Sequence, residues 1–101
     1  MTAFAVLAKL TAVAGKRAEL AEALQPTIAN AESEPGTRTY ILHEDVTDDN
    51  VLWYYELYES EEDFDVHRHS AFARDFGPSL AGLMAGRLEM TKLQPLAGKG
   101  L

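Results

Sequence analysis

Two side chains in the middle of the sequence can exchange protons with a bound molecule. His67 carries an imidazole, which titrates near neutrality and suits a general base at pH 7. Glu56 lies among the aromatic residues of an apolar segment. If Glu56 is buried, its pKa is raised or a cation lies beside it, and either condition is typical of functional sites. His67 and Glu56 are therefore the candidate catalytic residues.

Both residues also have a purely structural interpretation. His67 can bond a backbone or carboxylate group, and Glu56 can be a structural carboxylate bonded to His67 or to a loop amide. His69 is two residues further on, about 200° round a helix, so the two imidazoles cannot share a face or chelate a metal. From the residues alone, both interpretations stay open.

Further candidates lie on either side of this segment. His43, on an expected strand, can reach either a pocket or a subunit interface. Phe72 and Phe76 have the spacing of a helical core face, and they can also form the apolar wall of a substrate pocket. The acidic run 59–65 has the composition of a solvated helix start. No three ligand residues have metal-site spacing, so we expect no metal.

Apolar periodicity and turn residues predict the strands and helices that position these side chains. Strands are expected at residues 3–12, 37–46, 51–59 and 87–96. One helix is expected to follow Gly15 and to end by Glu34, with a kink or a loosened turn at Pro26. A second helical region is expected between the N-cap Ser60 and Gly86, with Ser70 capping a second piece and Gly77–Pro78 bending it.

This order of elements predicts a single α+β domain over residues 1–101. The succession β-α-β-β-α-β is that of the ferredoxin-like fold, in which a four-stranded antiparallel sheet has its helices on one face. The third strand is apolar on both faces, because Trp53 and Tyr55 alternate with Leu52, Tyr54 and Tyr58, among which Glu56 also lies. Helices can cover only one of these faces. We therefore expect a homodimer in which the sheets pack face to face, with Trp53 and Tyr55 in the interface.

The composition narrows the kinds of partner. Of 101 residues, 16 are acidic and 9 basic, for a net charge of −7, and the cations are scattered, so nucleic acid is not an expected partner. There is no cysteine, which excludes disulfides and thiolate chemistry. No apolar run approaches the roughly 20 residues that span a membrane. The first ten residues lack the basic region of a signal peptide, so we expect a cytoplasmic protein with no membrane partner.

Two segments contain several of these features: AEALQPTIANAESEPGTRTYIL and VLWYYELYESEEDFDVHRHSAF. The pattern consists of a helix closed by Glu34-Pro35-Gly36, Tyr40, a strand with Tyr54, Glu56 and Tyr58, the cap Ser60, His67, and Ser70 with Phe72. From about residue 3 to residue 96, the sequence resembles the antibiotic biosynthesis monooxygenase (ABM) family, which includes small quinol monooxygenases.

The resemblance implies a dimeric α+β barrel that oxidises a quinol or polyphenol, a small aromatic molecule, with dioxygen and no metal or flavin cofactor. An electron-rich phenolate can itself give an electron to dioxygen, so the protein needs a general base and a dry apolar cavity. In the haem-degrading branch of the family, the position of Tyr58 faces the ligand. This implies that Tyr54 and Tyr58 line the substrate pocket. That branch also needs Asn and His where Leu7 or Ala8 and Phe76 stand, so haem degradation is not expected.

Two other functions stay open. An isomerase or lyase of a small oxo compound is one, because the same fold hosts such relatives and a fold does not dictate chemistry. Turnover without oxygen consumption would identify it. The other is a non-enzymatic small-molecule binding protein, in which Tyr54, Tyr58, Phe72 and Phe76 close a cavity that has no buried base.

Overall fold

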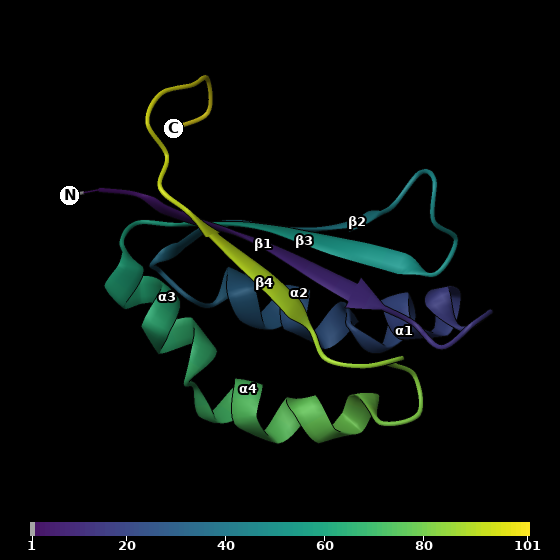
Figure 1. Cartoon of the computed structure of the whole chain (residues 1–101). Coiled ribbons are helices and arrows are strands. Elements are labelled where there is room, and N and C mark those ends of the chain that lie inside the picture. Colours follow the sequence, from purple (N-terminus) through teal and green to yellow (C-terminus); the bar gives the residue numbers. More distant parts are fainter. Residues whose placement is uncertain (1) are drawn as a thin grey trace.

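Four antiparallel strands form one sheet, and the helices lie against one of its faces (Figure 1). The computed structural model describes residues 2–101. The strands are β1 (Phe4–Thr11), β2 (Thr37–Glu44), β3 (Val51–Tyr58) and β4 (Glu89–Leu93), in the spatial order β2-β3-β1-β4. With helices between β1 and β2 and between β3 and β4, this is the ferredoxin-like α+β fold expected from the sequence.

Two short helices connect β1 to β2 along the chain and cover the sheet. They are α1 (Arg17–Ala23) and α2 (Gln25–Glu32), which meet at Leu24. Pro26 lies in the first turn of α2, where its missing N–H is not needed, so the expected loosened turn is a complete break between two helices. Leu20, Leu24 and Ala31 are buried, which gives the two helices an apolar side towards the core.

The second helical region consists of α3 (Glu61–Arg68), α4 (Ala71–Phe76) and the 3-10 turn η1 (Gly77–Leu80). Ser60 and Ser70 cap α3 and α4, as expected, by accepting the backbone N–H of Asp63 and of Ala73.

The prediction that this region stays helical as far as Gly86 is wrong. Pro78 lies in η1, and Gly82 has a φ of +86°, which ends helical geometry. Residues 83–85 instead continue along the end of β1, where the N–H of Ala85 donates to the carbonyl of Thr11 at 2.8 Å. Strand β4 is correspondingly shorter than the expected 87–96.

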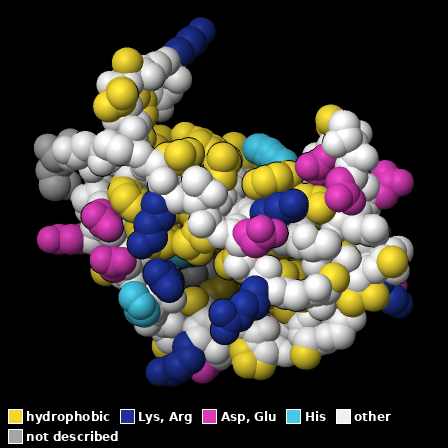
Figure 2. All heavy atoms as spheres, in the orientation of Figure 1, with side chains coloured by type: hydrophobic (Ala, Val, Ile, Leu, Met, Phe, Trp, Pro, Cys, Tyr) yellow, Lys and Arg dark blue, Asp and Glu magenta, His cyan; other side chains and the backbone are white. Residues whose placement is uncertain are grey.

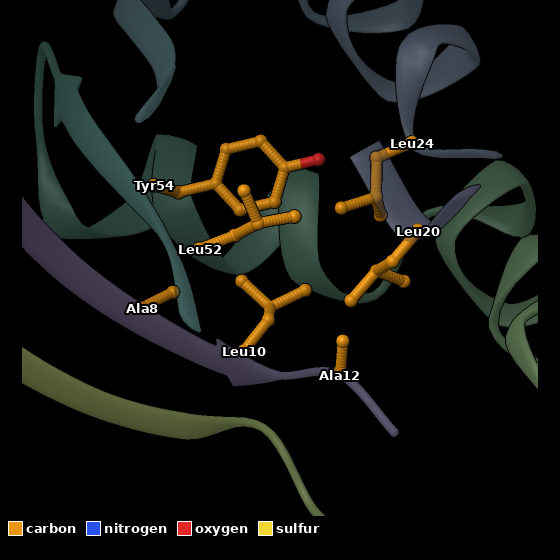
Figure 3. Packing of buried hydrophobic residues seen from close by; sticks show 7 residues of the cluster. All are labelled: Ala8, Leu10, Ala12, Leu20, Leu24, Leu52 and Tyr54. Carbon is orange, nitrogen blue, oxygen red and sulfur yellow. The ribbon is translucent and has the colours of Figure 1, made fainter. Parts of the chain in front are cut away.

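The core lies between the sheet and its helices. Figure 3 shows Leu10, Leu52 and Tyr54 from the strands facing Leu20 and Leu24 from the first helical pair. A second buried cluster, formed by Phe4, Val6, Tyr58 and Phe64, fixes α3 on the sheet. Large buried side chains thus hold both helical regions against the sheet.

The other face of the sheet carries no helix (Figure 1). Trp53 and Tyr55 are half-buried on it, and Ile41, which pairs with Tyr55 in the neighbouring strand, is 50% exposed. We call this surface the outer face. In residues 2–101, no helix is both long enough and apolar enough to cross a membrane.

Candidate functional site

A cavity of about 200 Å³ lies between the sheet and the α3–α4 segment. Its apolar walls come from all parts of the fold and include Ala8, Leu10, Leu24, Phe64, Phe72, Phe76, Leu80, Leu88 and Met90. Its polar groups are Thr27, Tyr40, Tyr54, Glu56, His67 and Arg68. Figure 2 shows a hollow with hydrophobic walls on this side of the molecule, with Lys and Arg side chains around it. Apolar walls with a few polar groups are typical of small-molecule sites.

His67 is held in this cavity by a carboxylate on another element. Its Nδ1 lies 2.7 Å from Oε1 of Glu34, which also accepts a hydrogen bond from the hydroxyl of Thr37 at 3.0 Å. With Glu34 ionised, Nδ1 carries the proton and donates it, so the other ring nitrogen, Nε2, holds the free lone pair. No hydrogen bond of residues 2–101 involves Nε2, and it is not fully enclosed. His67 therefore has the tautomer of a general base.

The N-terminus of α3 is docked on the turn that follows Glu34. The Ser60 hydroxyl donates to the Asp63 carboxylate at 2.9 Å while accepting its backbone N–H at 3.2 Å. The side chain of Asp63 fills the space beside Gly36, so closely that a Cβ on Gly36 would lie 2.7 Å from the Cβ of Asp63. This contact lies between Glu34 and the helix of His67, and so aligns the two side chains.

Glu56 is buried in the floor of the cavity, with 3% of its surface exposed. Burial raises the pKa of its carboxyl group, an effect that the hydrogen bond from Tyr58 and the charge of His67 oppose and the charge of Glu34 reinforces. The Tyr58 hydroxyl donates to Oε1 at 2.5 Å. Oε2 has no hydrogen-bond partner among residues 2–101 and is not fully enclosed. A protonated Glu56 can therefore donate a hydrogen bond to a ligand.

Two tyrosines complete the polar part of the wall. Thr27 donates to the carbonyl of Leu24 at 2.6 Å and lies 2.5 Å from the Tyr54 hydroxyl, so Tyr54 is the donor in that second bond. The rings of Tyr40 and Tyr54 have centroids 4.6 Å apart, and the ring of Tyr40 is 5.2 Å from His67. Burial is the main cause that raises the pKa of both phenols, so both stay neutral at physiological pH.

The structure brings most of the residues singled out in the sequence into one place. His67, Glu56, Tyr54, Phe72 and Phe76 line the cavity, and the rings of Phe72 and Phe76 stack 5.3 Å apart. Tyr58 lies behind this lining, fully buried, between Glu56 and Phe64.

The remaining candidates lie elsewhere. His43 is exposed and pairs with Trp53 in the strand register, which places it on the outer face and away from the cavity. Trp53 and Tyr55 occupy that same face, as their alternation with Tyr54 and Glu56 predicted. Of the two positions that His43 could reach, the structure therefore gives it the one on the outer face.

Sequence reasoning did not identify Glu34 and Thr27 as site residues. Glu34 was interpreted only as the end of a helix, and 33 residues separate it from His67 along the chain. Thr27 was assigned no role, although it holds the Tyr54 hydroxyl. Tyr40 entered only through the resemblance. A sequence gives no direct signal for such partners, because tertiary packing creates the contact.

Comparison with known families and structures agrees with this fold. The model of the family described as "Antibiotic biosynthesis monooxygenase" matches residues 3–78. No protein with a curated description matches the chain.

Solved structures similar to the chain cover almost all of its length. Rv0793 from Mycobacterium tuberculosis is 28% identical, with a TM-score of 0.84, over 96% of this chain and 98% of that one. A Caulobacter crescentus protein provisionally described as an antibiotic biosynthesis monooxygenase is 25% identical, with a TM-score of 0.87, over 95% and 92%. PA3566 from Pseudomonas aeruginosa, at 23% identity and a TM-score of 0.84 over 96% and 97%, shares the fold.

Proposed function

Because the chain belongs to the antibiotic biosynthesis monooxygenase family, we propose that it oxidises a small quinol or polyphenol with dioxygen, without a cofactor, in the cavity of His67 and Glu56. The cavity has a suitable size, since a dry cavity of roughly 150 Å³ holds benzene and this one measures about 200 Å³. Its apolar walls favour an aromatic ring, and its polar groups can bind a phenolic oxygen.

In this proposal His67 is the general base. Nε2 takes the proton of the phenol, and Glu34 stabilises the imidazolium that forms, because its carboxylate already accepts the Nδ1 proton. Glu56, in its protonated form, donates a hydrogen bond to the oxygen on which negative charge develops. The surrounding Phe64, Phe72 and Phe76 exclude water from the phenolate.

The oxidation balances without another reductant. The phenolate gives an electron to dioxygen, and the two radicals combine to form a bond between oxygen and the ring carbon opposite the hydroxyl, a carbon that carries a hydrogen. Loss of water from the resulting hydroperoxide, with the proton returned by His67, yields the quinone. For 1-naphthol, one oxygen atom of dioxygen enters the product and the other leaves as water.

One observation carries this proposal. Within residues 2–101, the cavity brings together an imidazole whose Nδ1 is fixed by a carboxylate, at 2.7 Å, and a buried carboxyl group whose pKa is raised. A structural role alone would not require a histidine whose Nε2 has no hydrogen bond among these residues to line an apolar cavity large enough for an aromatic ring.

Oxygen uptake with 1-naphthol tests the proposal. Wild-type protein treated with a chelator should consume one dioxygen per naphthol, and isotopically labelled dioxygen should leave one labelled atom in the quinone. His67→Ala should lower the rate by at least about a hundredfold, because general-base catalysis contributes this much. His69→Ala is the matched control, since His69 is exposed at the end of the same helix. Equal activity in His67→Ala would remove His67 as the base.

A proton-transfer isomerase of a small oxo compound is the second candidate. It is favoured by the location of His67, a base, and Glu56, a carboxyl group with a raised pKa, in one cavity. Such a pair can remove a proton from carbon and stabilise the enol. Turnover of an oxo compound under anaerobic conditions would support this function, and strict dependence on dioxygen would exclude it.

The assembly proposed with this function is a homodimer through the outer face. Ile41, Trp53 and Tyr55 form an apolar surface there that a second copy can cover. Each cavity lies on the helix-bearing side of its own sheet, so the proposed dimer leaves both cavities accessible.

A further inference from the structure

The mouth of the cavity is basic, although the chain as a whole is acidic. Arg68 lines the cavity, and it is exposed where its neighbour His67 is half-buried. Among the lining residues of the described chain it alone is charged at every physiological pH. The net charge of the protein is −7, so a cation at this point is opposite in sign to the average charge of the surface.

A second cation lies beside the same wall. Lys92 is on β4 and pairs with Val6, which is buried on the helix-bearing side, so the side chain of Lys92 faces that side too. Its Nζ is 5.7 Å from the ring centre of Phe64, and Phe64 lines the cavity. Two positions earlier, Met90 has the same orientation on β4 and is itself a lining residue.

Neither cation has an acidic partner within ion-pair distance among residues 2–101. Ion pairs of residues 2–101 engage Lys16, Arg17, Arg38 and Arg74, whereas Arg68 and Lys92 take part in none. Figure 2 shows Lys and Arg side chains around the hollow on this side. Arg68 also lies in the last turn of α3, where a cation stabilises the helix dipole, but this role does not require Lys92, which comes from a strand.

We infer that the ligand of this cavity is an aromatic acid: its ring enters the apolar hollow and its carboxylate is bound at the mouth by Arg68 and Lys92. The inference rests on the proposed function for the phenolic end of the ligand, which meets His67 and Glu56 deeper in the cavity. Arg68 can bind a carboxylate through two parallel N–H groups, and Lys92 adds a point charge.

A matched pair of ligands tests this assignment. Calorimetry without oxygen compares 6-hydroxy-2-naphthoate with 2-naphthol, which differ only in the carboxylate. Wild-type protein should bind the acid about three- to tenfold more tightly, as expected for a charge-assisted contact at an exposed mouth. This preference should be larger at roughly 0.01 M than at roughly 1 M ionic strength, because salt screens exposed charges.

Three variants locate the effect. Arg68→Gln and Lys92→Gln should each reduce the ratio of the two affinities towards one. Arg74→Gln is the matched control, because Arg74 is exposed on α4, paired with Asp75 and outside the cavity lining, and its ratio should equal that of the wild type. Three results would overturn the inference. They are equal affinities of the wild type for the two ligands, a ratio of affinities that is unchanged in both variants, and the absence of saturable binding for both ligands.

This test is separate from the test of the activity. A preference for the acid that depends on Arg68, together with no oxygen uptake from any naphthol, would leave the carboxylate site standing and refute the monooxygenase. Oxygen uptake from 1-naphthol, with no preference for the acid, would support the monooxygenase and refute the carboxylate site.

Discussion

A single nitrogen atom, Nε2 of His67, carries most of the proposed chemistry. It is available because the other ring nitrogen is engaged at 2.7 Å by Glu34. The residue type and position of His67 could be recognised in the sequence, as could those of Glu56. The carboxylate partner of His67 could not, because tertiary packing brings Glu34 to it from 33 residues away. Tyr58 is a local partner of Glu56, since residues two apart share a face of a strand. One structural interpretation of the sequence bonded Glu56 to His67. In the structure, His67 is bonded to Glu34 instead, and Glu56 accepts a hydrogen bond from Tyr58.

Glu56 gives the residue scale a prediction about pH. Between 4.5, its ordinary pKa, and the raised value, the folded chain keeps a proton that the unfolded chain has released, so the free energy of unfolding falls as pH rises. The slope is about 1.4 kcal/mol per pH unit within this window. Glu56→Gln cannot titrate and lacks this loss. Its stability relative to the wild type should therefore increase as pH rises above 4.5.

Urea unfolding of both proteins across this pH range measures the difference. The Gln side chain keeps an oxygen that can accept the Tyr58 hydrogen bond, so the variant removes the charge and preserves the contact. A difference in unfolding free energy that is the same at every pH would show that burial does not raise the pKa of Glu56.

At the scale of elements, the site is positioned by short helices that local contacts hold in place, and not by long helices with a continuous apolar period. Ser60 and Ser70 could be predicted as N-caps, because their side chains act on the next three residues. The end of the last helical region could not, because Met84 pairs with Ala12 at the end of β1, and this contact competes with continued helix. Tertiary hydrogen bonds thus ended the helical region before Gly86, where the sequence predicts its end.

Gly36 provides the test at this scale. A methyl group at position 36 would meet Asp63, so Gly36→Ala should displace the start of α3 and lower stability by roughly 1–3 kcal/mol. Because α3 carries His67, activity should fall as well. Gly77→Ala is the comparison, since a Cβ there meets nothing within 4 Å apart from its chain neighbours and the backbone is helical. The following Pro78 disfavours a Cβ in this conformation and the lower chain entropy of the unfolded state favours it, so its stability should stay within about 1 kcal/mol of the wild type.

Thermal and urea unfolding give the stabilities of the two glycine variants. If Gly36→Ala is as stable as Gly77→Ala and keeps full activity, then the contact between the turn and α3 does not position His67.

For the whole molecule, the order of strands and the side on which the helices lie could be predicted from the sequence. Both follow from the β-α-β-β-α-β succession, which the structure confirms with the order β2-β3-β1-β4. A cavity was expected from the resemblance, but its volume of about 200 Å³ could not be predicted, because it depends on how far α4 lies from the sheet, and no apolar pattern encodes that distance. The outer face remains the part of the molecule for which a partner is proposed.

Sedimentation velocity at micromolar concentration tests the proposed assembly. The wild type should sediment as a dimer, with twice the mass of the 11.1 kDa chain. Tyr55→Glu places a charge in the proposed interface and should give a monomer, because an unpaired buried charge costs several kcal/mol. Val66→Glu is the matched control: Val66 is 68% exposed on α3, away from the outer face, and the dimer should persist. A monomeric wild type would refute the dimer.

The absorption spectrum of naphthol bound to the protein without oxygen tests the account most directly, because it reports whether the cavity removes the phenolic proton. At pH 7 the wild type should show the spectrum of naphtholate, whereas His67→Ala and Glu34→Gln should bind naphthol in its neutral form. Neutral naphthol in the wild-type cavity, or naphtholate in the cavity of His67→Ala, would contradict the role given to His67.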